Sequence, residues 1–331
     1  DVAVITVVDY AVHEVSFYDE DLNLVKVETV NGGEVINPSE LASSNVWYPV
    51  NSDEAAEEAY VVDSDLAFFA VSSVKEINSV SDLKNISNDL DGRYVLGDSL
   101  DLSGINWEPI GTKSKPFTGR LNGKAKSIKG LTINRSSSDY VGLFGYAQGA
   151  NIIALRLNIN TVEGHDYVGA LVGHAARSTV TAVSVTGDKV VGTNYVAGIV
   201  GDLNIGTITA TFSTVDVEAT GDYVAGVVGD LDLGTVTATF SKGDITTTGD
   251  YVGGVVGHST LSTVTAAFVY GRIHGGDYVG GVVGRLRLGT VVATFLHGRA
   301  YGDSRVDGIV GGNLFGISVL NFADGLGFLA F

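Results

Sequence analysis

The stretch Asp250-Tyr251-Val252-Gly253-Gly254-Val255-Val256-Gly257 decides the fold, because near copies of it recur from the middle of the chain to its end. Successive copies begin 27 or 28 residues apart, and a seventh, degenerate copy begins at Val306. Such a period indicates one supersecondary unit stacked on itself, in which each copy buries its apolar face against its neighbours. The six complete copies open at Tyr140, Tyr167, Tyr195, Tyr223, Tyr251 and Tyr278.

Each repeat predicts three short strands separated by turns. Residues 223–228 form the first strand, residues 229–234 turn the corner and residues 244–248 form the last strand. The middle segment, residues 235–241, alternates strictly, so a period of two predicts that its threonines face outward and its other side chains inward. The predicted inward residues are Val236, Ala238 and Phe240.

Stacking the repeats in register places like residues in ladders about 4.8 Å apart, and aromatic and β-branched residues stack well in this way. We expect each tyrosine to lie over the small residue two positions later, as Tyr251 over Gly253. Val255 and Val256 are adjacent and both apolar, so both faces of this strand require cover, from this chain or from another subunit. The predicted repeat core comprises Phe212, Phe240, Phe268, Phe295, Tyr195, Tyr223 and Tyr251, with a second inner ladder of Ile208, Val236, Val264 and Val291.

The composition excludes several classes of protein. The 331 residues include 44 glycines, 4 prolines and no cysteine or methionine, which excludes a disulfide scaffold, a thiolate metal site and a cysteine nucleophile. No run of about 18 apolar residues is present, so we expect no membrane insertion of the mature chain. Because residue 1 is Asp and no methionine occurs, we expect a processed or shortened form from which any signal peptide has gone.

The net charge of −18 is unevenly distributed along the chain. Residues 1–100 carry 20 acidic and 4 basic side chains, whereas residues 101–331 carry 18 and 16. Neither part has the basic stripe that nucleic-acid binding requires, so we expect no nucleic-acid partner, and anionic membrane surfaces are disfavoured. Divalent cations are the natural counterions of the acidic part.

The N-terminal part predicts a small β-rich module. Residues 2–8 are apolar on both faces, which is typical of a strand whose partner comes from later in the chain or from another molecule. Two alternating strands around an acidic turn over residues 19–23 then predict a hairpin. The motif Phe-Tyr-Asp-x-Asp-x-Asn-Leu-Val-Lys, followed by Ile36-Asn37-Pro38, resembles the internalin-type B-repeat over residues 13–50. That resemblance implies a β-grasp-like module of bacterial surface proteins, ending in an aromatic strand around Trp47.

A strand and a helix are predicted next. Residues 67–71 predict a strand that leads into the following domain, and Ser81 predicts the N-cap of a helix over residues 82–90. Such a helix covers the open end of a solenoid, which would otherwise present unpaired strand edges. The apolar face of this helix comprises Leu83, Ile86 and Leu90.

The segment that follows carries an ordered string of motifs. Trp107-Glu108-Pro109-Ile110-Gly111, Pro116-Phe117-Thr118-Gly119 and Val141-Gly142-Leu143-Phe144-Gly145 succeed one another. Together with the repeats, they make residues 77–311 resemble the GLUG-motif proteins, which are large bacterial and archaeal cell-surface and secreted proteins. This resemblance implies a right-handed parallel β-solenoid in an extracellular or cell-surface protein, without a defined catalytic set.

The predicted fold is therefore all-β. It is a parallel β-solenoid, or β-helix, of about seven coils of about 28 residues, with a capping helix and a small N-terminal β module. The expected domains are an acidic β module at residues 1–75, the helix cap and first coils at 76–135, the repeats at 136–311, and an apolar cap or assembly segment at 312–331.

An acidic row precedes the first residue of each repeat. Carboxylates one rung apart could hold Ca²⁺, a hard cation that takes six to eight oxygen ligands. Asn194 interrupts the row, however, and the pattern favours a simpler role, in which Asp or Asn after Gly caps a tight turn with its own side chain. No cofactor is expected, and calcium is the candidate metal. The row is Asp139, Asp166, Asn194, Asp222, Asp250 and Asp277, of which Asp222, Asp250 and Asp277 are the calcium candidates.

Two further rows carry polar side chains. The first is a set of His, Asp and Arg residues at a corner of successive repeats, called the corner set, which could bind or cleave a polyuronate. Because its oppositely charged members lie on neighbouring rungs, the pattern also predicts ion pairs without any chemistry. A Thr-x-Thr row resembles the face of ice-binding solenoids, although Val183, Ala267 and Val292 interrupt it. The corner set is His174, Asp202, Asp230, His258 and Arg285, with Asn204, Asp232 and Arg287 two residues on; the threonine row is Thr207, Thr209, Thr211, Thr235, Thr237 and Thr239.

These observations predict a non-enzymatic, extracellular structural or adhesive protein. We expect head-to-tail self-assembly into a surface filament, because the open edge of the last coil could be closed by a strand or module of the next subunit. Further copies, other surface proteins and glycans are the expected partners. The alternatives are a carbohydrate-binding or polysaccharide-cleaving solenoid that depends on Arg285 and Arg287, and an ice-binding solenoid. The predicted assembly residues are Val2, Val4, Ile5, Val7, Leu314, Phe315, Phe328 and Phe331.

Overall fold

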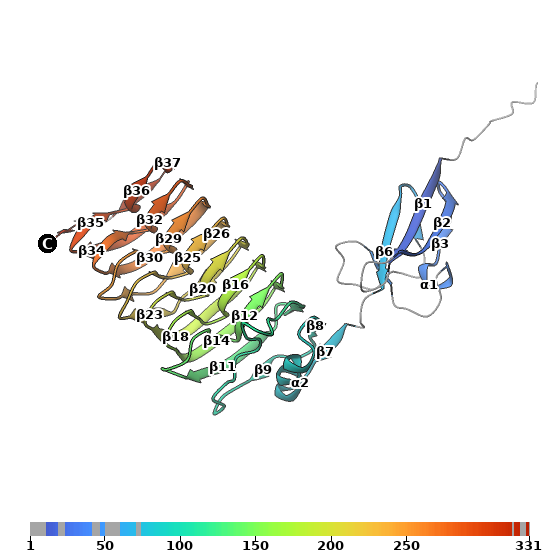
Figure 1. The fold of residues 1–331 in the computed structure, drawn as a ribbon, viewed down its shortest axis with the longest axis horizontal. Coiled ribbons are helices and arrows are strands. Elements are labelled where there is room, and N and C mark those ends of the chain that lie inside the picture. Colours follow the sequence, from blue (N-terminus) through green and yellow to red (C-terminus); the bar gives the residue numbers. More distant parts are fainter. Residues whose placement is uncertain are drawn as a thin grey trace, which may run out of the picture. The chain divides into compact units, whose positions relative to one another are not determined.

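The chain divides into two compact units, residues 1–74 and residues 75–331, so the boundary lies one residue before the expected one. Figure 1 shows the second unit as a stack of coils, from β7 (Lys75–Ile77) to β37 (Ile317–Val319). The computed structural model describes residues 11–18, 24–41, 47–49, 60–70, 74–319, 321–324 and 329–330.

The first unit contains a four-stranded sheet around a small aromatic core. Its elements are β1 (Val12–Tyr18), β2 (Leu24–Asn31), β3 (Val35–Ile36), α1 (Pro38–Leu41), β4 (Trp47–Pro49), β5 (Tyr60–Val61) and β6 (Leu66–Ala70). β1 and β2 form the predicted hairpin. β6 is the last strand before the second unit begins, and it pairs with both β1 and β4. Phe17 lies between Trp47 and Phe68, at ring-centroid distances of 4.8 and 5.5 Å, and all three are buried.

Two predictions for this unit concern residues outside those that the structure describes. They are the strand over residues 2–8 and the acidic turn over residues 19–23.

The second unit is a parallel β-solenoid of about eight turns, which confirms the predicted fold class and adds one coil to the expected number. Three parallel sheets run along it. The six-stranded sheet contains β15 (Val168–Gly169), β19 (Val196–Ala197), β24 (Val224–Ala225), β28 (Val252–Gly253), β31 (Asp277–Gly280) and β35 (Ser304–Asp307). The seven-stranded sheet contains β12 (Phe144–Gln148), β16 (Val172–Ala176), β20 (Val200–Asn204), β25 (Val228–Asp232), β29 (Val256–Thr260), β32 (Val283–Arg287) and β36 (Val310–Leu314).

The third sheet has twenty strands and covers the rest of each coil. It contains β7, β8 (Arg93–Leu96), β9 (Leu100–Asp101), β10 (Arg120–Asn122), β11 (Ser127–Asn134), β13 (Asn151–Ile153), β14 (Arg156–Glu163), β17 (Thr179–Thr181), β18 (Ser184–Gly192), β21 (Thr207–Thr209), β22 (Phe212–Ser213), β23 (Asp216–Ala219), β26 (Thr235–Lys242), β27 (Ile245–Thr246), β30 (Thr263–His274), β33 (Thr290–Val292), β34 (Phe295–Gly302), β37, β38 (Phe322–Asp324) and β39 (Leu329–Ala330).

A short helix packs on the first coils. α2 (Val80–Asn85) continues into the 3-10 turn η1 (Ile86–Asn88). The helix begins two residues earlier than predicted, because Ser79 and not Ser81 is its N-cap. The Ser79 hydroxyl accepts the backbone N–H of Asp82 at 3.2 Å, and the Asp82 carboxylate accepts a backbone N–H ahead of the cap. As predicted, the helix buries apolar side chains in the solenoid core, namely Leu83 and Ile86.

One residue in each coil reverses the predicted alternation of the middle segment. Val236 is buried as predicted, but Ala238 is exposed and has a φ of 54°, in the left-handed region. The chain turns a corner at Ala238, so the side chains that follow it exchange faces. Thr239 is buried and Phe240 is half-buried on the outside. The left-handed alanines are Ala154, Ala182, Ala210, Ala238, Ala266 and Ala293.

The phenylalanine ladder is therefore an outer ladder, which corrects the predicted repeat core. Phe212 and Phe268 are 38% and 51% exposed. The rings of Phe212 and Phe240 stack 5.1 Å apart on the outside of the coils. The inner ladder of Ile208, Val236, Val264 and Val291 is fully buried, as predicted. The outer ladder comprises Phe212, Phe240, Phe268, Phe295 and Phe322.

The repeated tyrosines are corner residues and not core residues. Tyr251 is half-buried with a φ of 60°, and β28 begins only after it. The chain turns again between β28 and β29, so Val255 and Val256 are both buried and the predicted outer cover is not needed. Gly257 is required because a Cβ there would lie 2.6 Å from the carbonyl oxygen of Tyr251. The left-handed tyrosines are Tyr140, Tyr167, Tyr195, Tyr223, Tyr251 and Tyr278.

A third corner follows the seven-stranded sheet. The sequence assigns residues 229–234 to a turn, but β25 occupies most of this segment and the corner is the single residue Leu233, with a φ of 54°. The members of this corner ladder are Arg177, Ile205, Leu233, Leu261, Leu288 and Phe315.

The reversal at Ala238 can be tested with two threonines on either side of it. Thr239→Asp should lower the free energy of unfolding by about 3 kcal/mol or more, because it buries an unpaired charge. Thr237→Asp, on the half-buried outer face, should change it by at most about 1 kcal/mol. Chemical denaturation of both variants checks this, and equal effects would mean that the alternation continues unbroken.

Candidate functional site

The corner tyrosines form one continuous stack along the solenoid. Neighbouring ring centroids lie 4.5 to 5.1 Å apart. Burial, followed by the neighbouring tyrosines and by Asp230 and Asp202, raises the pKa of the Tyr195 hydroxyl above its ordinary range. At the C-terminal end the guanidinium of Arg305 lies 4.5 Å from the ring centroid of Tyr278. Each tyrosine ring within the stack is therefore covered on both faces by the neighbouring rings. Only its edge and its hydroxyl are open to solvent.

The corner set lies beside this stack, on the seven-stranded sheet, in register from rung to rung. His174 Nδ1 lies 2.8 Å from Asp202 Oδ2, and His258 Nδ1 lies 2.8 Å from Asp230 Oδ1. The ion-pairing interpretation of these residues therefore agrees with their geometry. The set continues at its N-terminal end with Tyr146, whose ring stacks on His174 at 4.4 Å.

The two arginines assigned to glycan binding behave differently. The Arg285 guanidinium lies 5.5 Å from the ring centroid of Tyr251 and 5.1 Å from that of Tyr278, and it donates to the Tyr251 hydroxyl at 3.3 Å. Arg287 is exposed at the end of β32. Arg285 thus contributes to the tyrosine stack, whereas Arg287 is turned to solvent.

The acidic row caps backbone groups across rungs and not within its own turn. Asp222 Oδ1 accepts the backbone N–H of Asp250 at 2.8 Å, and Asp250 Oδ1 accepts that of Asp277 at 2.7 Å. Asn194 uses its amide oxygen in the same way, for the backbone N–H of Asp222 at 2.9 Å. One oxygen of each of the calcium candidates Asp222 and Asp250 is therefore occupied, while the Asp277 carboxylate accepts from Arg305 at 3.3 Å.

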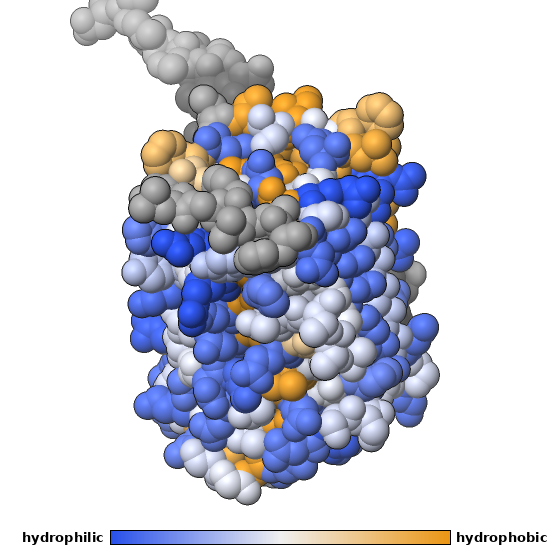
Figure 2. Space-filling view, turned by 90° about the vertical axis from the view of Figure 1, so that its left-hand side faces the viewer, coloured by the Kyte–Doolittle hydropathy of each residue, from blue (hydrophilic) through white to orange (hydrophobic). Residues whose placement is uncertain are grey.

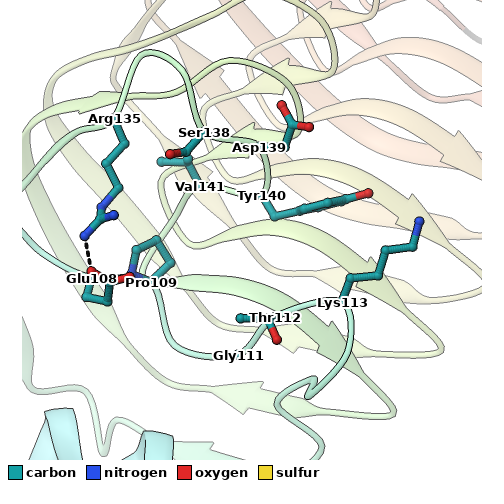
Figure 3. A pocket seen from close by; sticks show the side chains of 10 residues that line it. All are labelled: Glu108, Pro109, Gly111, Thr112, Lys113, Arg135, Ser138, Asp139, Tyr140 and Val141. Atoms are coloured by element: carbon teal, nitrogen blue, oxygen red, sulfur yellow. Dashed lines mark hydrogen bonds and ion pairs between the residues drawn. The ribbon is translucent and has the colours of Figure 1, made fainter.

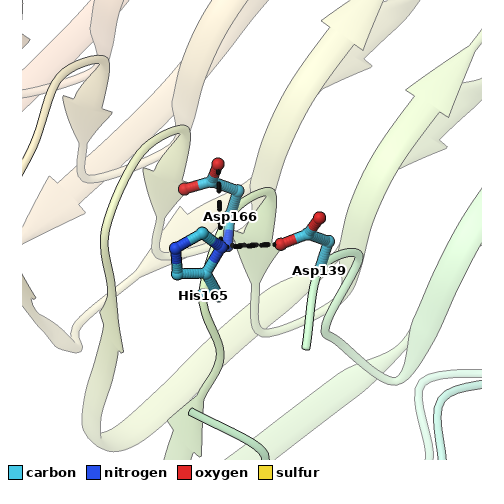
Figure 4. Close-up of side chains that lie close together, drawn as sticks. All are labelled: Asp139, His165 and Asp166. Carbon is cyan, nitrogen blue, oxygen red and sulfur yellow. Dashed lines mark hydrogen bonds and ion pairs between the residues drawn. The ribbon is translucent and has the colours of Figure 1, made fainter. Parts of the chain in front are cut away.

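Two other groups among the described residues bring three potential metal ligands together. In the first, His165 Nδ1 lies 2.9 Å from Asp139 Oδ1 and 3.8 Å from Asp166 Oδ2, with the imidazole facing both carboxylates (Figure 4). Its hydrogen bond to Asp139 raises the pKa of His165. The second is Asp230, Asp232 and His258, in which burial, followed by the Asp230 charge, raises the pKa of Asp232. In each group the imidazole Nδ1 is already hydrogen-bonded to one of the carboxylates, Asp139 in the first and Asp230 in the second.

The threonine row is narrower and more regular than predicted. Thr211 and Thr239 face inward, and so do Val183 and Ala267, which therefore do not interrupt the outer row. Four successive rungs carry a complete Thr-x-Thr in register, and the fifth, at Thr290, ends in Val292. The complete rungs are Thr179 and Thr181, Thr207 and Thr209, Thr235 and Thr237, and Thr263 and Thr265.

The last coil exposes apolar side chains. Phe315 is 82% exposed and Ile317 58% exposed, in a chain whose inner ladders are fully buried. Figure 2 faces the C-terminal coils and shows apolar surface gathered along one rim. We call this surface the C-terminal edge; it comprises Leu314, Phe315, Ile317, Val319 and Phe322. Of the predicted assembly residues, Leu314 and Phe315 belong to it, whereas Val2, Val4, Ile5, Val7, Phe328 and Phe331 lie outside the described residues.

A pocket of about 210 Å³ opens at the N-terminal end of the tyrosine stack, and sequence reasoning missed it. Figure 3 shows that the ring of Tyr140 forms one wall of this pocket, and that Pro109 and Lys113 also line it. We call it the stack-end pocket. The charged and aromatic residues that line it are Glu108, Lys113, Arg135, Asp139 and Tyr140.

Comparison with known proteins shows the fold and short related segments. No family model matches the chain. A segment of 77 residues, 22% of the chain, is 43% identical to a "Putative Gly-rich membrane protein" of Evansella cellulosilytica, of which it spans 9%. A segment of 110 residues, 28% of the chain, is 34% identical to halomucin of Haloquadratum walsbyi, of which it spans 1%. Among solved structures, an IgA1 protease superposes with a TM-score of 0.55 at 16% identity, over 88% of this chain and 24% of that one.

The solved structure shares the β-solenoid fold, and at this identity the likeness extends to the fold alone. Within the described residues, no helix has the length and apolar character needed to cross a bilayer. The GLUG and internalin-type resemblances remain predictions.

Substitutions at Asp250 separate capping from calcium binding. Asp250→Ala should lower the free energy of unfolding by about 1 kcal/mol, because the Asp277 backbone N–H loses its acceptor. Asp250→Asn should keep the wild-type value within about 0.5 kcal/mol, since Asn194 already accepts a backbone N–H in the same way two rungs earlier in this row. Thermal unfolding with calcium and with a chelator checks both, and a calcium-dependent stabilisation that both variants lose would favour coordination instead.

Proposed function

We propose that this chain is a structural component of a surface-exposed protein and that its solenoid associates head to tail with a second copy. The observation that carries the proposal is the difference between the two ends of the solenoid. Helix α2 buries Leu83 and Ile86 against the first coils, whereas the C-terminal edge leaves Phe315 and Ile317 exposed. An uncovered strand edge with apolar side chains is a template for pairing with another chain.

The names of the two sequence relatives support the surface location. One is described as a membrane protein and the other as a halomucin, although each match spans only a small part of the relative. A non-enzymatic role is supported by the corner set, because its side chains are hydrogen-bonded to one another across neighbouring rungs. His174 pairs with Asp202, and His258 pairs with Asp230. The regular stack gives a rod held together by repeated one-rung interactions.

Charge complementarity favours the N-terminal unit of the next copy as the occupant of the C-terminal edge. Residues 1–74 carry 15 acidic side chains and one basic side chain. Residues 272–305, in the last coils, carry five arginines and two aspartates. An acidic module would thus be attracted to the arginine-bearing end of the rod, and the apolar strand predicted over residues 2–8 could add to its open edge.

Sedimentation velocity over a range of protein concentrations tests the association. The wild-type chain should form larger species as its concentration rises, and these should weaken with added salt. The double variant Phe315→Asp with Ile317→Asp should remain monomeric, because it places charges on the apolar edge. Leu261→Asp is the matched control, since Leu261 is 54% exposed at a left-handed corner away from the edge.

Two results would count against this proposal. If the double variant and the wild-type chain sediment alike at every concentration, the C-terminal edge does not mediate association. If a chain lacking residues 1–10 assembles as well as the full chain by electron microscopy, the strand-addition form of the proposal is wrong.

The in-register threonine row favours ice binding as a second candidate function. Four complete Thr-x-Thr rungs form a regular outward array of hydroxyl and methyl groups. Thr209→Lys with Thr237→Lys should abolish any thermal hysteresis, because two bulky charges would interrupt the array at its centre. Lys129→Ala, away from the row, should leave it unchanged, and a wild-type chain without thermal hysteresis would eliminate this candidate.

A further inference from the structure

The tyrosine stack has one closed end and one open end. At the closed end, the guanidinium of Arg305 covers the ring of Tyr278 at 4.5 Å. At the other end, Tyr140 stacks on Tyr167 at 4.8 Å with one face only. Its second face borders the stack-end pocket. Among the described tyrosines of the stack, Tyr140 therefore offers a free aromatic face to a ligand.

The open face exists because the preceding coil is built differently. Ile110 lies one rung before Phe144, so the segment before it passes beneath the corner of Tyr140. That segment supplies Trp107, which is buried and donates from Nε1 to the Leu143 carbonyl at 3.1 Å. It then leaves the corner through Pro109 and a turn at Lys113, so among the described residues no second ring stacks parallel on Tyr140. The ring of Tyr146, 5.4 Å away, meets that of Tyr140 edge-on, at 65°.

The charges around the pocket are balanced except for one lysine. Arg135 forms an ion pair with Glu108 (Figure 3). Asp139 accepts from His165 at 2.9 Å and from the backbone N–H of Asp166 at 3.2 Å. Lys113 is exposed at the rim, on a turn closed by backbone hydrogen bonds, and has no ion-pair partner among the described residues. The pocket can therefore accept one negative charge near Lys113 without leaving another group unpaired.

We propose that the stack-end pocket binds one ring of an acidic saccharide, with the apolar face of the sugar on Tyr140 and its carboxylate on Lys113. A sugar ring has an apolar C–H face that suits the negative face of an aromatic ring, and its hydroxyls suit a rim of charged groups. Arg135 and Glu108 on one side and Asp139 on another supply donors and acceptors for those hydroxyls. The volume of 210 Å³ is below the range of about 300–1,000 Å³ of drug-sized pockets, so the site accommodates a single ring.

This site differs from the arginine site that the sequence predicts. Arg285 lies against two rings whose faces are already covered, by neighbouring tyrosines and, at Tyr278, by Arg305, so it can offer a sugar no free aromatic face. Lys113 and Tyr140, in contrast, combine a free cation and a free ring face in one concave site. The proposal does not depend on self-association, because the pocket lies at the opposite end of the tyrosine stack from Arg305.

Titrations followed by saturation-transfer NMR test the proposal with two ligands that differ only in the carboxylate. The full chain should bind methyl β-glucuronide, and methyl β-glucoside should bind about tenfold more weakly, because it lacks the charge-assisted contact. Tyr140→Ala should weaken glucuronide binding about tenfold or more, whereas Tyr140→Phe, which keeps the ring face, should retain it. Lys113→Gln should abolish the difference between the two sugars.

Two matched controls separate binding from structural damage. Tyr195→Ala removes a half-buried, left-handed tyrosine from the middle of the same stack, where both faces are covered, and should leave glucuronide binding unchanged. Lys115→Gln removes the same charge from the same turn, at a residue that does not line the pocket, and should also have no effect.

Three outcomes would overturn the proposal. The first is the absence of saturation transfer to either sugar. The second is equal weakening by Tyr195→Ala and Tyr140→Ala, which would trace the effect to the stack as a whole. The third is acetate competing as well as the glucuronide, which would identify a site for a bare carboxylate and not for a saccharide.

Discussion

The solenoid depends on its corners, where residues other than glycine adopt the left-handed conformation. Each regular coil turns at a tyrosine, at a residue aligned with Leu233, and at an alanine such as Ala238, with φ between 49° and 64°. A left-handed residue with a Cβ costs about 1–2 kcal/mol, so each corner must be maintained by its surroundings. The surroundings are the same corner one rung away: the backbone N–H of Tyr223 donates to the Asp250 carbonyl, and that of Leu233 to the Thr260 carbonyl. Parallel register and corner conformation thus support one another.

This mutual support explains where the period can change. β27 and β30 pair with Thr246 opposite His274, a step of 28 residues, whereas β28 and β31 pair Val252 with Val279, a step of 27. The lost residue lies in the loop just before the tyrosine corner. Strands and corners keep their register, and the loop absorbs the difference because it pairs least with its neighbours.

Sequence patterns predicted those features that depend on repetition alone. The period, the parallel solenoid, the inner ladder that contains Val236 and the apolar face of the capping helix follow from spacing, because burial against a like neighbour is a strong constraint. The side on which Phe240 lies could not be read in the same way. A period of two holds only while the chain stays extended, and Ala238 has no side-chain feature that marks it as left-handed. Its signal is positional, since alanine fills that place in each repeat from Ala154 to Ala293.

The same reasoning explains why the stack-end pocket was missed. Tyr140 has the same sequence context as the other corner tyrosines, and only the absence of a ring beneath it distinguishes it. The irregular coil before it places Pro109, and not a tyrosine, beside the corner of Tyr140. Prediction from the repeat treats every copy as equivalent, whereas the pocket exists because the first copy has a neighbour of a different kind.

A regular ladder also limits where chemistry can occur on such a rod. Within the ladder, ring faces are covered by rings, carboxylates by backbone N–H groups of the next rung, and imidazoles by carboxylates, as at Tyr195, Asp222 and His258. A ligand that bound there would have to displace an interaction repeated on both sides of it. The ends and the irregular coils escape this constraint, because their groups have a neighbour on one side only. Specific binding on this rod is therefore expected at the first coils and at the C-terminal edge, while the coils between them set the distance that separates the two.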